Sequence, residues 1–143
     1  MKRLNLFFAI IGFLLFSCSE RSGKKEKEAV SYAPLTKMER EAGSSLYRSK
    51  CMNCHLANGQ GIQGVYPPLA DSDFLRNNVT KSLRMVKFGA NIPIKVNGQK
   101  YHNLMPASGL QDEDLVTVFN YVLNSWGNQY GRISLKDVKE LKP

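Results

Sequence analysis

The sequence predicts one small all-α domain in residues 35–143. Two stretches, 36–50 and 112–126, carry apolar or small residues at three- and four-residue intervals, which is the periodicity of an amphipathic helix. Between them lies Cys51-Met52-Asn53-Cys54-His55, which brings two thiols and an imidazole close together in the chain. A domain of this length can bury one modest core. The motif indicates that a bound group enlarges that core.

The first 17 residues have the pattern of a secretory signal peptide. A basic start, Lys2-Arg3, precedes an almost uninterrupted apolar stretch over 4–16. This stretch is shorter than the ~20 residues of a transmembrane helix. It ends in Leu15-Phe16-Ser17-Cys18, which resembles a bacterial lipobox, although Phe16 is bulky for its position. We expect lipidation at Cys18 and a place in the cell envelope, on the periplasmic or extracytoplasmic side of a bacterial membrane. Plain secretion with a free Cys18, or a retained anchor, is the alternative.

Residues 18–34 link this segment to the domain. They are rich in Lys, Glu and Ser and poor in apolar residues, which predicts a flexible tether. The whole chain has a formal net charge of +8. A basic balance suits docking to an acidic partner or an anionic membrane. Because the chain shows no nucleic-acid-binding motif, we expect no nucleic acid among its partners.

Cys51, Cys54 and His55 have the spacing with which a c-type haem is attached. Each thiol would form a thioether bond with a vinyl group of one porphyrin, and His55 would lie beneath the iron as an axial ligand. With Cys18 assigned to the lipid, no cysteine pair remains for a disulfide. A structural zinc site is the alternative, but it needs a fourth ligand, for which His102 is the spare histidine.

The remaining elements are predicted from caps, breakers and periodicity. Thr36 and Glu39 form a capping box that begins the first helix. Gly89 stops a later helix, Asn97-Gly98 is a tight-turn dipeptide, and Gly127 ends the last long helix. In chain order, we predict helices at 36–50, 72–77 and 80–88, a small hairpin at 92–101, and helices at 112–126 and 134–141.

A glycine-rich loop over 57–64 follows the attachment motif. We expect it to let the backbone pass close to a flat ligand. The next segment, Tyr66-Pro67-Pro68-Leu69, is predicted to be extended because proline restricts both itself and the residue before it.

Met105, followed by Pro106, is the best candidate for a second axial ligand. A thioether sulfur suits a haem iron, and the proline stiffens the loop that holds it. His102 is the serious competitor, although a lone histidine in a polar loop is usually solvated. Among the other methionines, Met38 and Met85 lie in predicted helices, where methionine usually fills a core, and Met52 lies inside the attachment motif.

Together these residues resemble the class I cytochromes c over residues 36–143. Gly43 and Tyr47 resemble the glycine and the aromatic residue of that family's N-terminal helix, which implies a close crossing of the N- and C-terminal helices. The resemblance also implies that the Pro67 carbonyl accepts a hydrogen bond from the imidazole of His55 and that Leu69 packs on the porphyrin. Pro67 is the better match to the family's proline, and for Pro68 the alternative that it only makes the turn rigid has equal weight.

A narrower resemblance is to the cytochrome c modules associated with copper-containing nitrite reductases. Similar segments occur in cytochrome subunits of periplasmic dehydrogenases and in terminal oxidases, so the resemblance implies a redox protein as partner without selecting one. The segments that carry it are 59–62, 66–70, 96–106 and 124–128.

The class I resemblance implies an electron carrier rather than an enzyme, with one covalently bound haem c whose iron is held by His55 and Met105. Electrons would pass through the exposed haem edge. The alternative is a haem enzyme or gas sensor with an open sixth position, but the sequence shows no distal acid–base pair for it. Four lysines are candidates for a docking rim around the haem edge, namely Lys50, Lys81, Lys87 and Lys100.

Overall fold

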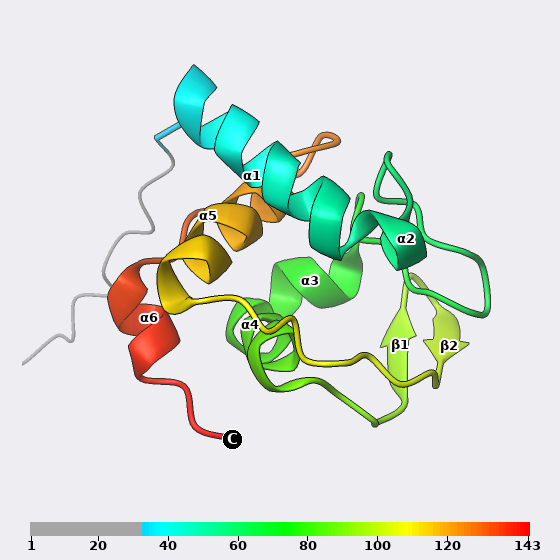
Figure 1. Ribbon diagram of the computed structural model, residues 1–143. Coiled ribbons are helices and arrows are strands. Elements are labelled where there is room, and N and C mark those ends of the chain that lie inside the picture. The colour runs from blue at the N-terminus through cyan, green and yellow to red at the C-terminus, as the bar shows by residue number, and fades with distance from the viewer. Residues whose placement is uncertain (1–32) are drawn as a thin grey trace, which may run out of the picture.

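The computed structural model describes residues 33–143 and confirms a mainly helical fold (Figure 1). The predicted signal peptide, Cys18 and nearly all of the tether lie outside the described residues. The helices are α1 (Lys37–Lys50), α2 (Met52–His55), α3 (Asp73–Asn77), α4 (Val79–Phe88), α5 (Asp112–Leu123) and α6 (Leu135–Lys139). The strands β1 (Ile94–Val96) and β2 (Gln99–Tyr101) pair antiparallel as the predicted hairpin.

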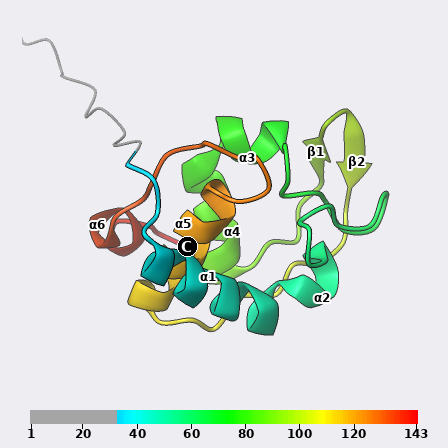
Figure 2. The ribbon, with the colours of Figure 1, turned by 90° about the horizontal axis from the view of Figure 1, so that it is seen from above.

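The N-terminal helix α1 packs against the C-terminal helix α5, and the other elements are arranged around this pair (Figures 1 and 2). In both views α6 and the hairpin lie at opposite ends of the molecule. The buried core joins α1 and α5 to α3, α4 and α6. Its members are Tyr47, Leu75, Leu83, Leu115, Val118, Phe119, Val122, Leu123 and Val138. None of the helices in residues 33–143 combines the length and apolar character needed to span a membrane.

Gly43 sets how closely α1 approaches α5. A Cβ atom at this position would lie 2.4 Å from the Cβ of Tyr121 and 3.0 Å from the carbonyl oxygen of Thr117. Both atoms belong to or adjoin the backbone of α5, so rotation of a side chain cannot relieve the overlap. One turn later, the ring of Tyr47 packs edge-on against Trp126, with centroids 4.9 Å apart. The helices therefore meet across a glycine and an aromatic cluster.

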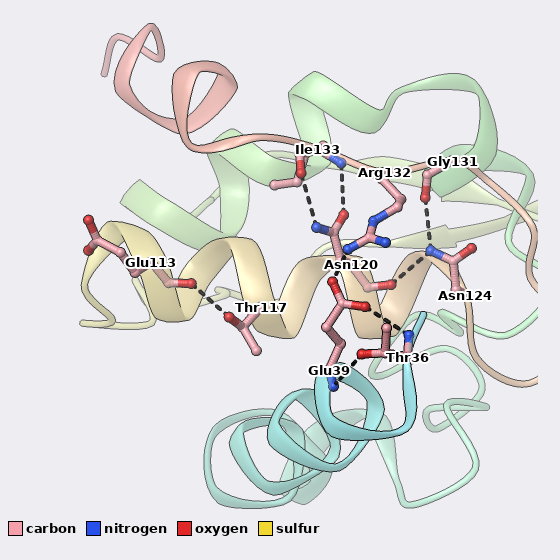
Figure 3. Close-up of polar contacts among 9 residues, drawn as sticks. All are labelled: Thr36, Glu39, Glu113, Thr117, Asn120, Asn124, Gly131, Arg132 and Ile133. Atoms are coloured by element: carbon pink, nitrogen blue, oxygen red, sulfur yellow. Dashed lines mark hydrogen bonds and ion pairs between the residues drawn. The ribbon is translucent and has the colours of Figure 1, made fainter. Parts of the chain in front are cut away.

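The N-terminus of α1 is held by the predicted capping box and by an ion pair. The Thr36 amide donates to the Glu39 carboxylate, and the Glu39 amide donates to the Thr36 hydroxyl. The same carboxylate pairs with the guanidinium of Arg132, which precedes α6 (Figure 3). The hydrogen bond from the Thr36 amide, followed by that from Arg132, lowers the pKa of Glu39 from 4.5 to about 2. This contact connects the two ends of the domain.

The amide side chains of Asn120, which is buried, and Asn124, which is partly buried, hold the segment after α5 against the helix. Asn120 donates to the carbonyl of Ile133 at 3.0 Å and accepts from its amide at 2.7 Å. Asn124 donates to the carbonyls of Asn120 and Gly131 (Figure 3). Asparagine can do both because its amide carries a donor and an acceptor.

The predicted end of the last long helix at Trp126 is wrong, since α5 ends at Leu123. Asn124 has left the helical conformation, and Trp126 has a φ of +53°. The turn is stabilised by side chains bonding back to the helix, including the hydroxyl of Ser125, which donates to the carbonyl of Tyr121 at 2.6 Å. This turn brings the indole of Trp126 against Tyr47 and Tyr121. The aromatic contacts stabilise the turn more than continuing the helix to Trp126 would, although the apolar periodicity continues that far.

Gly43→Ala is expected to destabilise the folded protein. Alanine at a free helical position gains ~1 kcal/mol over glycine. Here the overlap with Tyr121 should outweigh that gain, because overpacking a tight contact costs ~1–3 kcal/mol. Denaturant unfolding followed by circular dichroism measures the difference. The matched control is Ser45→Ala, at an exposed position of α1 that should be neutral or slightly stabilised. A gain of stability in Gly43→Ala would contradict the close crossing.

Glu39→Gln should destabilise the domain at neutral pH and lose this effect in acid. A carboxyl whose pKa is lowered on folding stabilises the folded state above its unfolded pKa, and that stabilisation disappears as pH falls through its folded pKa. The difference in melting temperature between the wild type and Glu39→Gln should therefore shrink between about pH 4.5 and about pH 2. Glu41→Gln is the control. The Glu41 carboxylate is exposed and its ion pair with Lys37 is long at 3.9 Å, so its loss should change the melting temperature little at any pH. A difference independent of pH would rule out the ionised Glu39 as its source.

Candidate haem site

The predicted haem residues lie around one cavity of about 220 Å³. Cys51, Cys54 and His55 line it from the end of α1 and from α2, and Met105 lines it from the segment before α5. Pro67 and Leu69 contribute from the extended segment between α2 and α3. Apolar side chains of α4, α5 and the hairpin complete the wall, including Val86, Ile94, Val96, Val118 and Phe119.

His55 is buried and has a defined orientation. Only 7% of the residue is exposed, and its Nδ1 lies 2.9 Å from the carbonyl oxygen of Pro67. A carbonyl can only accept, so Nδ1 carries the proton and Nε2 keeps its lone pair. Burial lowers the pKa of His55, against a smaller opposing effect of this hydrogen bond. The lowered pKa favours the neutral imidazole, and its Nε2 is available to bind a metal.

The thiols of Cys51 and Cys54 are free and partly buried. Burial, followed by the proximity of Cys54, raises the pKa of Cys51 to about 11. Both thiols line the same cavity as His55, which follows from their place on one helical turn. This is the arrangement that two thioether bonds along one edge of a porphyrin require.

The glycine-rich loop after His55 also passes close to other parts of the chain. A Cβ on Gly59 would lie 2.5 Å from the indole ring of Trp126. One on Gly61 would lie 2.3 Å from the carbonyl oxygen of Tyr66 and 2.6 Å from that of Pro67. The close approaches are thus to Trp126 and to the extended segment. They place the Pro67 carbonyl where His55 can donate to it.

Two polar side chains, Tyr47 and Asn128, hold the ends of the segment between α2 and α3 through contacts that the sequence did not identify. The hydroxyl of Tyr47 donates to the carbonyl of Leu56 at 2.7 Å. Asn128, which is 3% exposed, donates to the carbonyl of Leu69 at 2.9 Å and accepts from the amide of Asp71. The resemblance over 124–128 pointed to the segment that contains Asn128, but the sequence carried no signal for these contacts.

Met105 is held against the end of α4 through its backbone. Its amide donates to the carbonyl of Ala90 and its carbonyl accepts from the amide of Ala90, both at 2.8 Å. Of its rivals, Met85 also lines the cavity from α4 and is 8% exposed. Met38 is 78% exposed, and His102 is exposed and absent from the cavity wall. The geometry leaves Met105 and Met85 as the thioethers that face this space.

One of the four candidate docking lysines has another role. The ammonium of Lys87 lies 2.8 Å from the Asp112 carboxylate and donates to the carbonyl of Val138 at 3.0 Å. It therefore connects α4 to α5 and α6. Lys50, Lys81 and Lys100 remain exposed. Three exposed apolar residues also line the cavity and are here called the apolar rim: Val65, Ile92 and Leu104.

The donor set fits haem better than zinc. Within residues 33–143, no three His, Cys, Asp or Glu side chains are placed to hold a metal ion together. The apolar wall, two thiols, an imidazole with a free Nε2 and a thioether suit a flat, largely apolar macrocycle with a central iron. The hydroxyl of Ser82 on the cavity wall is buried and has no hydrogen-bond partner among the described residues. Because Ser82 lines the cavity, a group bound there would lie next to this hydroxyl.

The fold and the donor set together define a small helical domain of the kind that binds haem through two thioether bonds. The chain belongs to the cytochrome c family, since the sequence model of the family described as "Cytochrome c" matches residues 40–126. Membership implies covalent haem c, for which Cys51 and Cys54 are present. Domains of this family typically carry electrons rather than catalyse a reaction.

The chain is similar to several cytochromes from bacteria. It is 33% identical to a cytochrome c-552 of Thermus thermophilus over 106 residues, which cover 71% of this chain and 76% of that one. It is 30% identical to the cytochrome c subunit of a quinone alcohol dehydrogenase of Gluconobacter oxydans and 32% identical to the cytochrome subunit of a fructose dehydrogenase of Gluconobacter japonicus. These matches cover 71% and 70% of this chain, but only 22% of each subunit.

Proposed function

We propose that the protein is a lipid-anchored class I cytochrome c with one haem, which carries single electrons between redox proteins of the cell envelope. Cys51 and Cys54 would attach the haem, and His55 and Met105 would be its axial ligands. The observation that supports this most strongly is that all four side chains line one apolar cavity. When bound, the haem supplies an iron that exchanges one electron between its ferrous and ferric states.

The chain's own residues would keep both ligands in place during electron transfer. The carbonyl of Pro67 orients His55 and strengthens its donor character through the hydrogen bond from Nδ1. The bonds between Met105 and Ala90 restrain the second ligand. Apolar side chains of the wall exclude water and favour the less charged, reduced state of the site. These features support a carrier that rearranges little when it is oxidised or reduced.

We infer that the partners are redox proteins: a dehydrogenase, a copper-containing nitrite reductase or a terminal oxidase. The similarity to dehydrogenase cytochrome subunits supports the first. The four segments that resemble nitrite reductase modules support the second. Docking would use the apolar rim, together with Lys50, Lys81 and Lys100. Such contacts are small and short-lived in electron-transfer complexes.

The proposed location is the periplasmic or extracytoplasmic side of a bacterial membrane, where a lipid on Cys18 would anchor the chain. Its support is the lipobox-like Leu15-Phe16-Ser17-Cys18 after an apolar stretch. Residues 18–34 would then tether the domain, with a root-mean-square reach of roughly 20 Å. This would keep the haem edge close to the membrane while leaving the domain free to turn toward a partner.

Methionine ligation is tested by the absorption spectrum of the haem-loaded protein. The ferric wild type should show the far-red charge-transfer band of a methionine–iron bond. Met105→Ala should lose the band and gain carbon monoxide binding in the ferrous state. Met85→Ala is the matched control, since Met85 faces the same cavity, and it should keep the band. A band that persists in Met105→Ala and disappears in Met85→Ala would reverse the ligand assignment. Strong carbon monoxide binding by the wild type would favour a gas sensor.

The lipid anchor is tested by cell fractionation. The wild type should be found with the membranes and be released by detergent, because its acyl chains insert into the bilayer. Cys18→Ser should lack the lipid, which mass spectrometry of the mature chain would show directly. Ser19→Ala, at the neighbouring position, should behave as the wild type. An unlipidated, fully soluble wild-type protein would exclude the anchor while leaving the haem chemistry intact.

A further inference from the structure

We propose that Gly89 is the positioning residue for Met105, and that the contact between them decides whether the sixth coordination position of the iron is closed. The inference rests on the proposed function, because it takes Met105 as the iron ligand. Gly89 would not touch the haem but would control the position of Met105 through the backbone.

The backbone conformation at Gly89 is one that glycine alone adopts readily. Gly89 caps α4, and its amide donates to the carbonyl of Met85 at 2.9 Å. Its φ is +80° and its ψ is 172°, a region that is essentially restricted to glycine. The chain leaves α4 in this conformation, which directs Ala90 toward Met105.

The Met105 segment then crosses Gly89 at backbone contact distance. A Cβ on Gly89 would lie 2.9 Å from the carbonyl oxygen of Met105 and 2.9 Å from the amide nitrogen of Ala107. Both are backbone atoms, so the overlap could be relieved only by moving the segment that carries Met105. The missing side chain therefore makes the approach possible.

Three backbone hydrogen bonds flank this contact. Two join Met105 to Ala90 at 2.8 Å, and one runs from the amide of Ser108 to the carbonyl of Val86 at 2.9 Å. Leu104 and Pro106, on either side of Met105, are exposed. The seam with α4, defined as residues 86–90 and 105–108, is therefore the main restraint on where the thioether lies. A ligating group must be held within roughly 0.5 Å of its productive position, so a shift of the seam would release it.

The test compares Gly89→Ala with Gly98→Ala in the haem-loaded protein. Gly98 has a nearly equal φ of +83°, but a Cβ there would have no atom within 4 Å. Both variants carry the penalty of a left-handed φ, and only Gly89→Ala disturbs the seam. Gly89→Ala should lose at least half of the far-red band and gain carbon monoxide binding in the ferrous state. Gly98→Ala should keep the full band and stay closed to carbon monoxide.

The outcomes separate this inference from the proposed function. A wild type without the far-red band would contradict the proposed ligand. A wild type with the band and a Met105→Ala variant without it would support the ligand. If Gly89→Ala then keeps the full band and excludes carbon monoxide, as Gly98→Ala does, the role of Gly89 is refuted while the proposed function stands.

A second measurement needs no variant and covers the case in which Gly89→Ala does not fold. Coupling between the seam and iron ligation must be reciprocal, so displacing Met105 from the iron must weaken the seam. Cyanide bound to the ferric wild type should accelerate hydrogen exchange of the Met105 and Ala90 amides at least tenfold. Amides of the β1–β2 hairpin should be unaffected. Unchanged exchange at Met105 and Ala90 after cyanide binding would overturn the proposal.

Discussion

The contact between α1 and α5 is the constraint on which the rest of the structure depends. It is close because Gly43 has no side chain to separate the helices, and the ring of Tyr47 fills the space one turn later. The same helix then leads directly into Cys51, so the angle of α1 on α5 sets where the attachment motif lies. Since α5 also supplies Val118 and Phe119 to the cavity wall, the helix crossing and the site share one framework.

The loop between α2 and α3 depends on this framework in turn. The hydroxyl of Tyr47 fixes the start of the loop at Leu56, and Asn128 fixes its end at Leu69. Trp126 fills the space under Gly59 in the middle. With both ends and the centre restrained, the Pro67 carbonyl has a defined position, and the hydrogen bond that orients His55 can form without much further loss of entropy.

Features that arise from neighbouring residues could be predicted from the sequence. The capping box of Thr36 and Glu39, the turn at Asn97-Gly98 and the haem motif each involve a few consecutive positions, so their chemistry is visible in the chain. The spacing of apolar residues in α5 also predicted the buried face of that helix. The predictions that were wrong or incomplete concerned features that depend on contacts between residues far apart in the chain. The end of α5 is set by Trp126 packing on Tyr47, and Lys87 is engaged because Asp112 lies 2.8 Å away.

The cavity shows the same division. Local spacing pointed to Cys51, Cys54 and His55, and ligand chemistry pointed to Met105, but their meeting in one space is a property of the fold. The roles of Asn128 and Gly59 could not be predicted because their partners are far away in the chain. Two backbone approaches beside the site have one thing in common. Gly61 lies against the Pro67 carbonyl, and Gly89 lies against the Met105 carbonyl. All these glycines have a positive φ, but at Gly64 and Gly109 a side chain would at least extend into open space. Across homologous sequences, Gly61 and Gly89 should therefore vary less than Gly64 and Gly109. Substitutions at Gly61 and Gly89 among homologues would then show whether the Pro67 side or the Met105 side of the cavity has been kept unchanged.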